Sequence, residues 1–189
     1  MQLDKAIETR HSARSFKTST PNWRKIIKAI DAARLAPLAG NVNCMKFVVV
    51  SDKEVISQLA TACQQKHVGQ VKYIVVVCTK LSELINAYDK RAERYARQQA
   101  GAAIENFLLK LNDLGLATCW TGAFADNQVK SILKIPDKEK DKVNIEAIFP
   151  IGKELRKSKQ RAKPPLDTIL YFNKWKNEYM IPLRKPEAF

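Results

Sequence analysis

Apolar side chains recur at three-and-four spacing in several stretches of the chain, a pattern that predicts amphipathic helices. Capping residues stand where three of these helices begin: Asn22, the pair Ser51-Asp52, and either Asp126 or Asn127. The longest stretch ends at Gly115, a typical C-terminal cap, and its middle consists of small residues that let another backbone approach closely. The predicted helices cover residues 2–9, 22–36, 51–62, 89–114 and 126–133.

Runs of β-branched and apolar residues predict four strands between these helices. The stretch 71–79 is apolar on both faces, so we expect it in the interior of the sheet. Strands that alternate with helices are typical of parallel βαβ units. However, no Gly-x-Gly-x-x-Gly motif follows a strand and no Gly-x-x-x-x-Gly-Lys loop occurs, so the usual phosphate-binding loops of such folds are missing from the sequence. The predicted strands are residues 47–50, 71–79, 116–121 and 143–151.

Length and composition are those of a single globular domain. The chain has 189 residues, of which 46% are hydrophobic, and it contains no repeat or biased tract. Its apolar runs are far shorter than the roughly 20 residues that a membrane-spanning helix needs. The N-terminus also lacks the zones of a signal peptide. We therefore expect a cytoplasmic protein with no membrane partner.

The net charge of +14 raises the question of a polyanionic partner. The basic residues are widely spread, and the densest region, 153–163, has neither interleaved aromatics nor a nucleic-acid-binding motif. This pattern favours a solvated basic surface over an anionic ligand such as a nucleotide, and a basic polyanion-binding protein stays a far weaker alternative. We expect no nucleic acid. The four cysteines have no metal-ligand spacing, so we expect reduced, unpaired thiols and no structural metal.

Two guanidinium groups and a hydroxyl lie within five residues at the end of the first predicted helix, at Arg10, Ser12 and Arg14. Arginine presents forked donors that match phosphate oxygens, and charge-assisted hydrogen bonds of this kind contribute roughly 1.5–3 kcal/mol each. The segment therefore indicates a phosphate-binding site, although the same residues could form a basic surface loop.

The order of several motifs resembles that of the nitroreductase family. Residues 10–16 are similar to the family's Arg-Arg/His-Ser-x-Arg/Lys-x-Phe, residues 36–43 to its Ala-Pro-Ser-Ala-x-Asn-x-Gln, and residues 115–124 to its Gly-Leu-Gly-Ser-x-Trp-x-Gly-x-Phe. Further family-like segments follow in the same order at residues 133–136, 148–152 and 161–166. The resemblance covers residues 1–172.

This resemblance implies an α+β, nitroreductase-like fold, with a mostly antiparallel central sheet flanked by helices in place of parallel βαβ units. It implies an intertwined homodimer with FMN at the interface. Residues 1–172 would form the FMN-binding domain, and residues 173–189 a C-terminal extension that docks on the partner subunit. The implied reaction passes hydride from NAD(P)H through FMN to a small-molecule acceptor, a nitroaromatic, quinone, enone or flavin, by a ping-pong mechanism.

The resemblance also assigns residues to the flavin site, where the cofactor rather than a side chain carries the chemistry. The phosphate and ribityl chain would be bound by the N-terminal loop and by two cations of a C-terminal loop. The partner subunit would line the flavin ring and its polar edge, and a small-residue segment would place backbone near the reactive N5. The implied cofactor-binding residues are Arg10, His11, Ser12, Arg14, Pro37, Leu38, Asn41, Asn43, Thr121, Gly122, Ala123, Arg161 and Lys163.

The sequence departs from the family pattern beside the flavin. The usual Gln-Pro-Trp is Asn43-Cys44-Met45 here, which shortens a polar arm and removes an aromatic wall. Cys44 is either a thiol that faces the flavin pocket or a simple small-residue replacement. Because of this departure, a flavoenzyme that catalyses a different reaction, such as reductive dehalogenation or flavin fragmentation, stays an alternative. Of the two histidines, His11 would belong to the phosphate loop, and we expect His67 on the surface.

Overall fold

The computed structural model describes residues 2–136, 142–156, 158 and 162–180. The chain divides into two units, residues 1–158 and 159–189. The first unit contains the sheet and nearly all of the helices. The second contains a short 3-10 helix, η5 (Leu166–Thr168), and an aromatic pair in which the rings of Tyr171 and Trp175 lie 5.0 Å apart.

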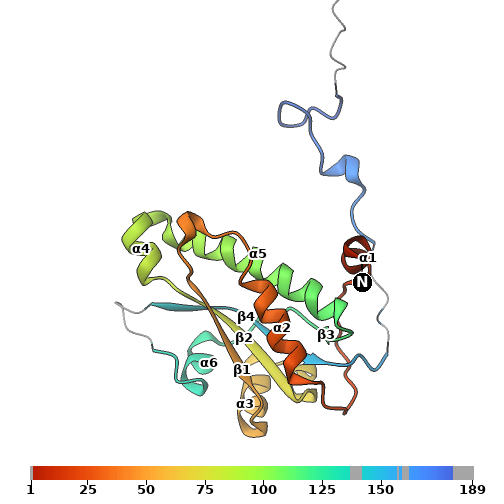
Figure 1. Ribbon diagram of the computed structural model, residues 1–189, viewed down its shortest axis with the longest axis vertical. Coiled ribbons are helices and arrows are strands. Elements are labelled where there is room, and N and C mark those ends of the chain that lie inside the picture. Colours follow the sequence, from red (N-terminus) through yellow and green to blue (C-terminus); the bar gives the residue numbers. More distant parts are fainter. Residues whose placement is uncertain (1, 137–141, 157, 159–161, 181–189) are drawn as a thin grey trace, which may run out of the picture. The chain divides into compact units, whose positions relative to one another are not determined.

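The sheet of the first unit has four strands in the order β1-β2-β4-β3, and every pair is antiparallel (Figure 1). β2 lies in the interior, as its apolar character predicts. The bounds are β1 Met45–Val50, β2 Tyr73–Lys80, β3 Ala117–Thr118 and β4 Val143–Gly152.

Two layers of helices enclose this sheet, α2 and α5 on one face and α3 and α6 on the other (Figure 1). Alternate residues of β2 enter the two layers. Val75 and Val77 pack with α2 and α5, whereas Ile74 and Val76 pack with α3 and α6. Burial of both faces explains why the sequence of this strand shows no polar alternation. The helices are α1 Leu3–Thr9, α2 Trp23–Ala33, α3 Lys53–Cys63, α4 Ser82–Tyr88, α5 Ala92–Asp113 and α6 Asp126–Ile132.

The caps of two helices are as predicted, and that of a third is not. The side chain of Asn22 accepts a hydrogen bond from Arg24 N, and the side chain of Asp52 accepts bonds from the first turn of α3. For α6 the N-cap is Ala125, which makes no side-chain cap, and Asp126 is the first helical residue. Its carboxylate therefore acts through its charge near the helix start.

Two predicted elements also have other bounds. The stretch from 89 onward holds the 3-10 helix η3 (Asp89–Arg91) before α5, and α4 precedes it. The strand expected at 116–121 has only two ladder residues, followed by an isolated bridge between Thr121 and Ile148. Among the described residues, no helix is long and apolar enough to cross a bilayer.

Candidate functional site

Backbone hydrogen bonds fix the N-terminal loop, residues 10–17, against the edge of the sheet. Ala13 N donates to Thr118 O at 2.9 Å, and Lys17 N donates to Lys153 O at 2.8 Å. Phe16 forms an isolated antiparallel bridge with Glu154 and is buried beside Gly152, where a Cβ would collide with the Phe16 ring. The loop therefore has a defined backbone path and presents its polar side chains from a rigid base.

Two of the predicted phosphate-binding side chains contact carboxylates. Nε2 of His11 lies 2.9 Å from Oε2 of Glu154, and Nε of Arg10 lies 3.5 Å from Oε1 of Glu105. Ser12 is half-buried and Arg14 is exposed. Within the part of the chain that the structure describes, Arg14 has no ion-pair partner. Arg14 is thus open to an anion.

A cavity of about 310 Å³ opens beside the same loop. Its walls come from the end of α1, the second half of α5, β3 and the end of β4. The buried Thr118 lies in this wall, and its hydroxyl has no hydrogen-bond partner among the described residues. The lining residues are Thr9, Arg10, His11, Leu108, Asn112, Gly115, Leu116, Ala117, Thr118 and Glu154.

The segment Thr121 to Ala123 follows β3 along the same sheet. Thr121 and Ile148 exchange two backbone hydrogen bonds, of 3.1 and 3.0 Å. The Thr121 side chain is buried, and its hydroxyl also has no partner within the described chain. Gly122 and Ala123 are both exposed. The backbone that the resemblance assigns to the flavin therefore borders solvent. It follows directly after Thr121, which is held by its hydrogen bonds to β4.

The 3-10 helix η2 (Lys66–Gln70) connects the N-terminal loop with this segment. The side chain of Gln65, just before η2, donates to Ala123 O at 3.5 Å. At the other end of η2, the side-chain oxygen of Gln70 accepts a bond from Phe16 N at 3.4 Å. One end of η2 thus contacts the N-terminal loop, and the other end contacts the segment that follows β3.

The structure corrects the prediction that His67 lies on the surface. His67 is only 8% exposed, and its Nε2 has no hydrogen-bond partner among the described residues. The residues around His67, 64–70, are mostly polar, and a 3-10 helix has neither a helical nor a strand period, so the sequence gave no signal for burial. Burial lowers the pKa of His67, and the nearby charge of Arg14 lowers it further. The ring is therefore neutral at pH 7.

The predicted residues of loop 37–43 lie at the opposite end of the sheet from the N-terminal loop. This loop leads into Met45, which pairs with Thr79, whereas the N-terminal loop pairs with the far end of β4. Pro37, Asn41 and Asn43 are exposed and Leu38 is half-buried. A single copy of the described chain does not bring these residues to the loop at 10–17.

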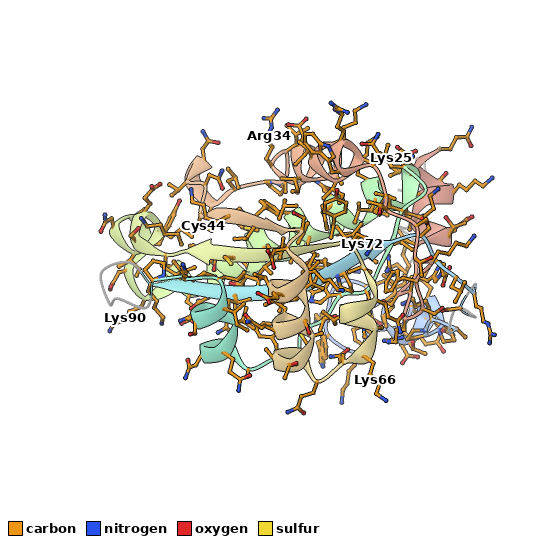
Figure 2. All side chains as sticks on the ribbon, turned by 90° about the horizontal axis from the view of Figure 1, so that it is seen from below. Lys25, Arg34, Cys44, Lys66, Lys72 and Lys90 are labelled. Carbon is orange, nitrogen blue, oxygen red and sulfur yellow. The ribbon has the colours of Figure 1, made fainter. Side chains whose placement is uncertain are left out.

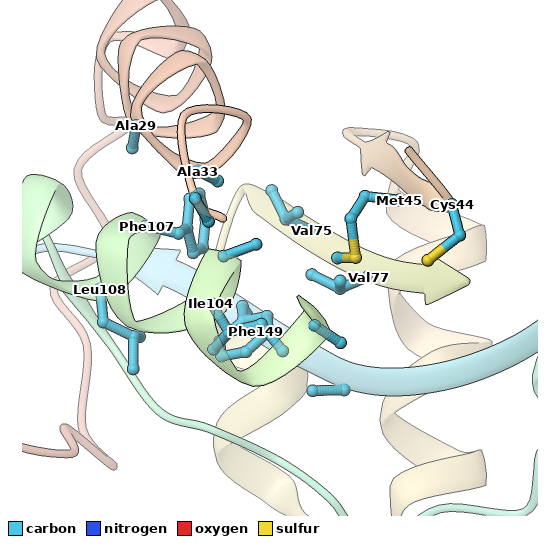
Figure 3. Packing of buried hydrophobic residues seen from close by; sticks show 14 of the residues in the cluster. Ala29, Ala33, Cys44, Met45, Val75, Val77, Ile104, Phe107, Leu108 and Phe149 are labelled. Carbon is cyan, nitrogen blue, oxygen red and sulfur yellow. The ribbon is translucent and has the colours of Figure 1, made fainter. Parts of the chain in front are cut away.

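Cys44 and Met45 both point into the core between the sheet and α5 (Figure 3). Cys44 is 1% exposed, its Sγ lies 3.6 Å from the side-chain amide of Gln99, and burial raises the pKa of its thiol to about 11. The thiol is therefore protonated and enclosed, in agreement with a small-residue replacement. All four cysteines are free and buried.

The basic C-terminal loop belongs to the second unit. Arg161 lies outside the described residues, and Lys163 is exposed. In the first unit, the labelled cations Lys25, Arg34 and Lys72 lie on different parts of the surface (Figure 2).

Comparisons with known proteins identify the family. The model of the nitroreductase family matches residues 7–67 and 61–153. An Archaeoglobus fulgidus protein described as an NADH dehydrogenase/NAD(P)H nitroreductase is 31% identical over 140 residues, which are 70% of this chain and 76% of that protein. An oxygen-insensitive NADPH nitroreductase of Helicobacter acinonychis is 24% identical over 84% of this chain and 90% of its own length.

Solved structures agree. A nitroreductase family protein of Clostridium novyi superposes with a TM-score of 0.72 at 27% identity, covering 94% of this chain and 96% of that chain. The fold is also that of the Vibrio harveyi NADPH:FMN oxidoreductase, with a TM-score of 0.82 at 17% identity, covering 93% of this chain and 78% of the other. The chain belongs to the nitroreductase family, and its α+β fold is the fold of that family.

The residues of the first unit fit a flavin nucleotide. An anion would meet the exposed Arg14 and the half-buried Ser12 of the N-terminal loop.

Proposed function

We propose that this chain is an FMN-dependent oxidoreductase that passes hydride from NAD(P)H to a small-molecule acceptor, and that two copies assemble around the flavin. The class of NAD(P)H-dependent oxidoreductases follows from the family. The observation that carries the finer proposal is that η2 contacts both the N-terminal loop, which presents the exposed Arg14, and the exposed segment Gly122–Ala123.

In this proposal the protein binds and orients the cofactor, and FMN, when bound, supplies the hydride chemistry. Arg14 and Ser12 hold the phosphate, and Arg10 and His11 contribute charge and hydrogen bonds while they also hold Glu105 and Glu154. Lys163, and Arg161 beyond the described residues, add positive charge from the second unit. NAD(P)H and the acceptor would use the same open face in turn, in the manner of a ping-pong enzyme.

A second copy is needed to complete this site. Asn41 and Asn43 lie at the other end of the sheet, so they can line a flavin at the loop 10–17 only when they come from a partner. Exposed apolar side chains support such an assembly. Leu3 and Leu35 are 66% and 68% exposed and border a groove of about 380 Å³ between α1, α2 and α5. Burial of this groove in a dimer would remove apolar surface from water.

The C-terminal extension would add to the same interface. Within the second unit, Trp175 is 81% exposed and Tyr179 is 78% exposed. Large aromatic side chains contribute much of the binding energy of protein interfaces. We propose that this extension docks on the partner subunit. Removal of residues 173–189 should therefore weaken dimerisation in analytical ultracentrifugation, and an unchanged dissociation constant would contradict the docking.

Asn43 is the only exposed residue of the three that depart from the family pattern, since Cys44 and Met45 lie in the core. The departure therefore affects the proposed flavin site through Asn43, whose side chain is shorter than the glutamine of the family pattern. Reductive dehalogenation or flavin fragmentation stays the alternative, and product analysis after anaerobic reduction separates it from ordinary acceptor turnover with intact flavin.

The decisive experiment is an absorption spectrum of the purified, untreated protein, followed by oxidation of NADH and NADPH with a nitroaromatic, a quinone, an enone and free flavin. We expect a bound flavin spectrum and acceptor-dependent oxidation. A colourless protein that also fails to bind added FMN would contradict the proposal.

A further inference from the structure

A second cavity, of about 390 Å³, lies between the start of α3 and the chain that leaves η2. Its walls are Thr18, residues from the first two turns of α3 with the preceding Ser51, and residues 69–72. None of these residues lines the cavity beside the N-terminal loop or belongs to the predicted flavin-binding set. The volume is that of a pocket for a small molecule. We call this the α3 cavity.

The walls of the α3 cavity are held in place by close packing and by a hydrogen bond. A Cβ at Gly69 would lie 3.2 Å from the Cβ of Ala60, so the end of η2 packs against α3 with little room to spare. The side-chain oxygen of Gln70 accepts a bond from Phe16 N, two residues before Thr18. The three segments that form the cavity are therefore tied to one another, and the cavity is part of the folded first unit.

The charge at the α3 cavity is positive. Lys53 and Lys72 both line it, from different elements, and the described lining residues include no carboxylate. Within the described chain, neither lysine forms an ion pair. The nearby Asp52 does not line the cavity, and its carboxylate accepts bonds of 2.8 and 3.0 Å from the backbone N of Glu54 and Val55. An anion would therefore meet two cations that the described chain leaves uncompensated.

Hydroxyl groups and apolar surface complete the lining. The side chains of Thr18, Ser51 and Ser57 line the cavity and form no hydrogen bond with other described residues. Ammonium and hydroxyl groups are donors that phosphate oxygens accept from. The buried Ile56 and Val71 also line the cavity, so apolar surface lies beside the donors. This combination suits a ligand with an anionic end and a carbon-rich end.

We propose that the α3 cavity binds a small organic phosphate ester. The phosphate contacts Lys53 and Lys72 and accepts bonds from the hydroxyls, and the organic part lies against Ile56 and Val71. The inference goes beyond the proposed function, because it uses none of the residues assigned to FMN. It gives the chain a second anion site, on the far side of η2 from the segment Gly122–Ala123.

The test is isothermal titration calorimetry of FMN-saturated protein with phenyl phosphate and with inorganic phosphate as probes. Saturation with FMN keeps the probes away from the N-terminal loop. We expect wild-type protein to bind phenyl phosphate, and to bind inorganic phosphate about three- to tenfold more weakly because it lacks the apolar contact. The double variant Lys53→Gln, Lys72→Gln should bind phenyl phosphate about a hundredfold more weakly, since each charge-assisted contact corresponds to about tenfold in affinity.

The matched control is the double variant Lys28→Gln, Lys46→Gln. It removes the same charge from two exposed lysines that line none of the described cavities. Its affinity for phenyl phosphate should equal that of the wild type. Equal losses in the two double variants would show an effect of overall charge and overturn the inference.

Three further outcomes would also overturn it. These are wild-type protein that binds neither probe, equal affinity for the two probes, and a loss of FMN affinity in the Lys53→Gln, Lys72→Gln variant, which would assign both lysines to the flavin phosphate. A wild-type chain that binds no FMN would overturn the proposed function instead. The same titrations of flavin-free protein, with their dependence on Lys53 and Lys72, would still test the α3 cavity.

Discussion

The His11 ring and the Glu154 carboxylate join the N-terminal loop to the end of β4, with Nε2 of His11 2.9 and 3.1 Å from the two carboxylate oxygens. The other ring nitrogen, Nδ1, lies 2.9 Å from Thr9 O, so both nitrogens face acceptors. Glu154 also accepts bonds from the backbone N and the hydroxyl of Ser158, at 3.0 and 3.1 Å. One carboxylate therefore holds three segments together.

Glu154→Gln should destabilise the protein in a pH-dependent manner. Burial raises the pKa of Glu154, but hydrogen bonds from Ser158 and His11 outweigh burial and hold the pKa below the ordinary value of 4.5. A carboxyl group with a depressed pKa stabilises the fold above its unfolded pKa, and this contribution is lost as pH falls through the folded pKa. We expect a loss of about 1–2 kcal/mol at pH 7.

Urea denaturation of both proteins at a series of pH values checks this expectation. The gap between the wild type and Glu154→Gln should shrink as pH falls below 4.5, because the wild-type carboxyl then becomes protonated. A gap of the same size at neutral and acidic pH would mean that the charge of Glu154 does not matter.

Arg14→Ala should weaken FMN binding and leave the stability of the protein nearly unchanged. Arg14 is exposed and has no ion-pair partner in the described chain, so its removal costs the fold little. Loss of charge-assisted bonds to a phosphate corresponds to a roughly ten- to hundredfold weaker affinity. Arg14→Lys keeps the charge but not the forked donors and should lie between the two.

The charge-matched control for Arg14 is Arg97→Ala, which removes an exposed arginine from an i,i+4 pair with Glu93 on α5. Its FMN affinity should equal that of the wild type. If both variants lose affinity equally, the effect reflects the overall charge of the protein and not a contact at the N-terminal loop.

Gln99 should anchor the loop that carries Asn41. Gln99 is 4% exposed on the core face of α5, and in the favoured orientation its amide donates to Val42 O and accepts from Ala39 N, both at 3.2 Å. Gln99→Leu leaves both backbone groups without these partners and should cost about 1–3 kcal/mol. Gln99→Glu still accepts from Ala39 N but cannot donate, so we expect an intermediate loss.

Gln98→Leu provides the control, since Gln98 is the exposed neighbour on the same helix. It should change the free energy of unfolding by less than about 0.5 kcal/mol. If Gln99→Leu is as stable as Gln98→Leu, the loop is held by other contacts.

Much of this fold could be predicted from local patterns. The caps at Asn22 and Asp52 and the apolar run of β2 each depend on neighbours in sequence, and the structure confirms them. The direction of the strands does not depend on neighbours. After β1, the chain leaves through α3 and returns through η2 to the same end of the sheet, so an alternating strand and helix pattern yields antiparallel neighbours.

The site was predicted in part, for the same reason. The arginines of the N-terminal loop form a compact motif, which the sequence shows directly. His67 was placed wrongly because its burial comes from the packing of η2 against segments that are distant in sequence. The carboxylate partners of Arg10 and His11 are about 95 and 143 positions away. No local pattern reports pairs of this kind.

Gly40 and Tyr88 provide the last prediction, because they fit together where the loop 37–43 meets the end of α4. Gly40 has φ +55°, and a Cβ at this position would overlap the Tyr88 hydroxyl. The Tyr88 ring is in turn held edge-on to Tyr95, with centroids 5.0 Å apart, so it cannot simply turn away. Gly40→Ala should therefore cost about 2–3 kcal/mol, of which about 1–2 is left-handed backbone strain. In a Tyr88→Phe background the hydroxyl is gone, so the same substitution should cost about 1 kcal/mol less. A double-mutant cycle in urea measures this coupling, and additive effects would show that strain alone makes Gly40 necessary.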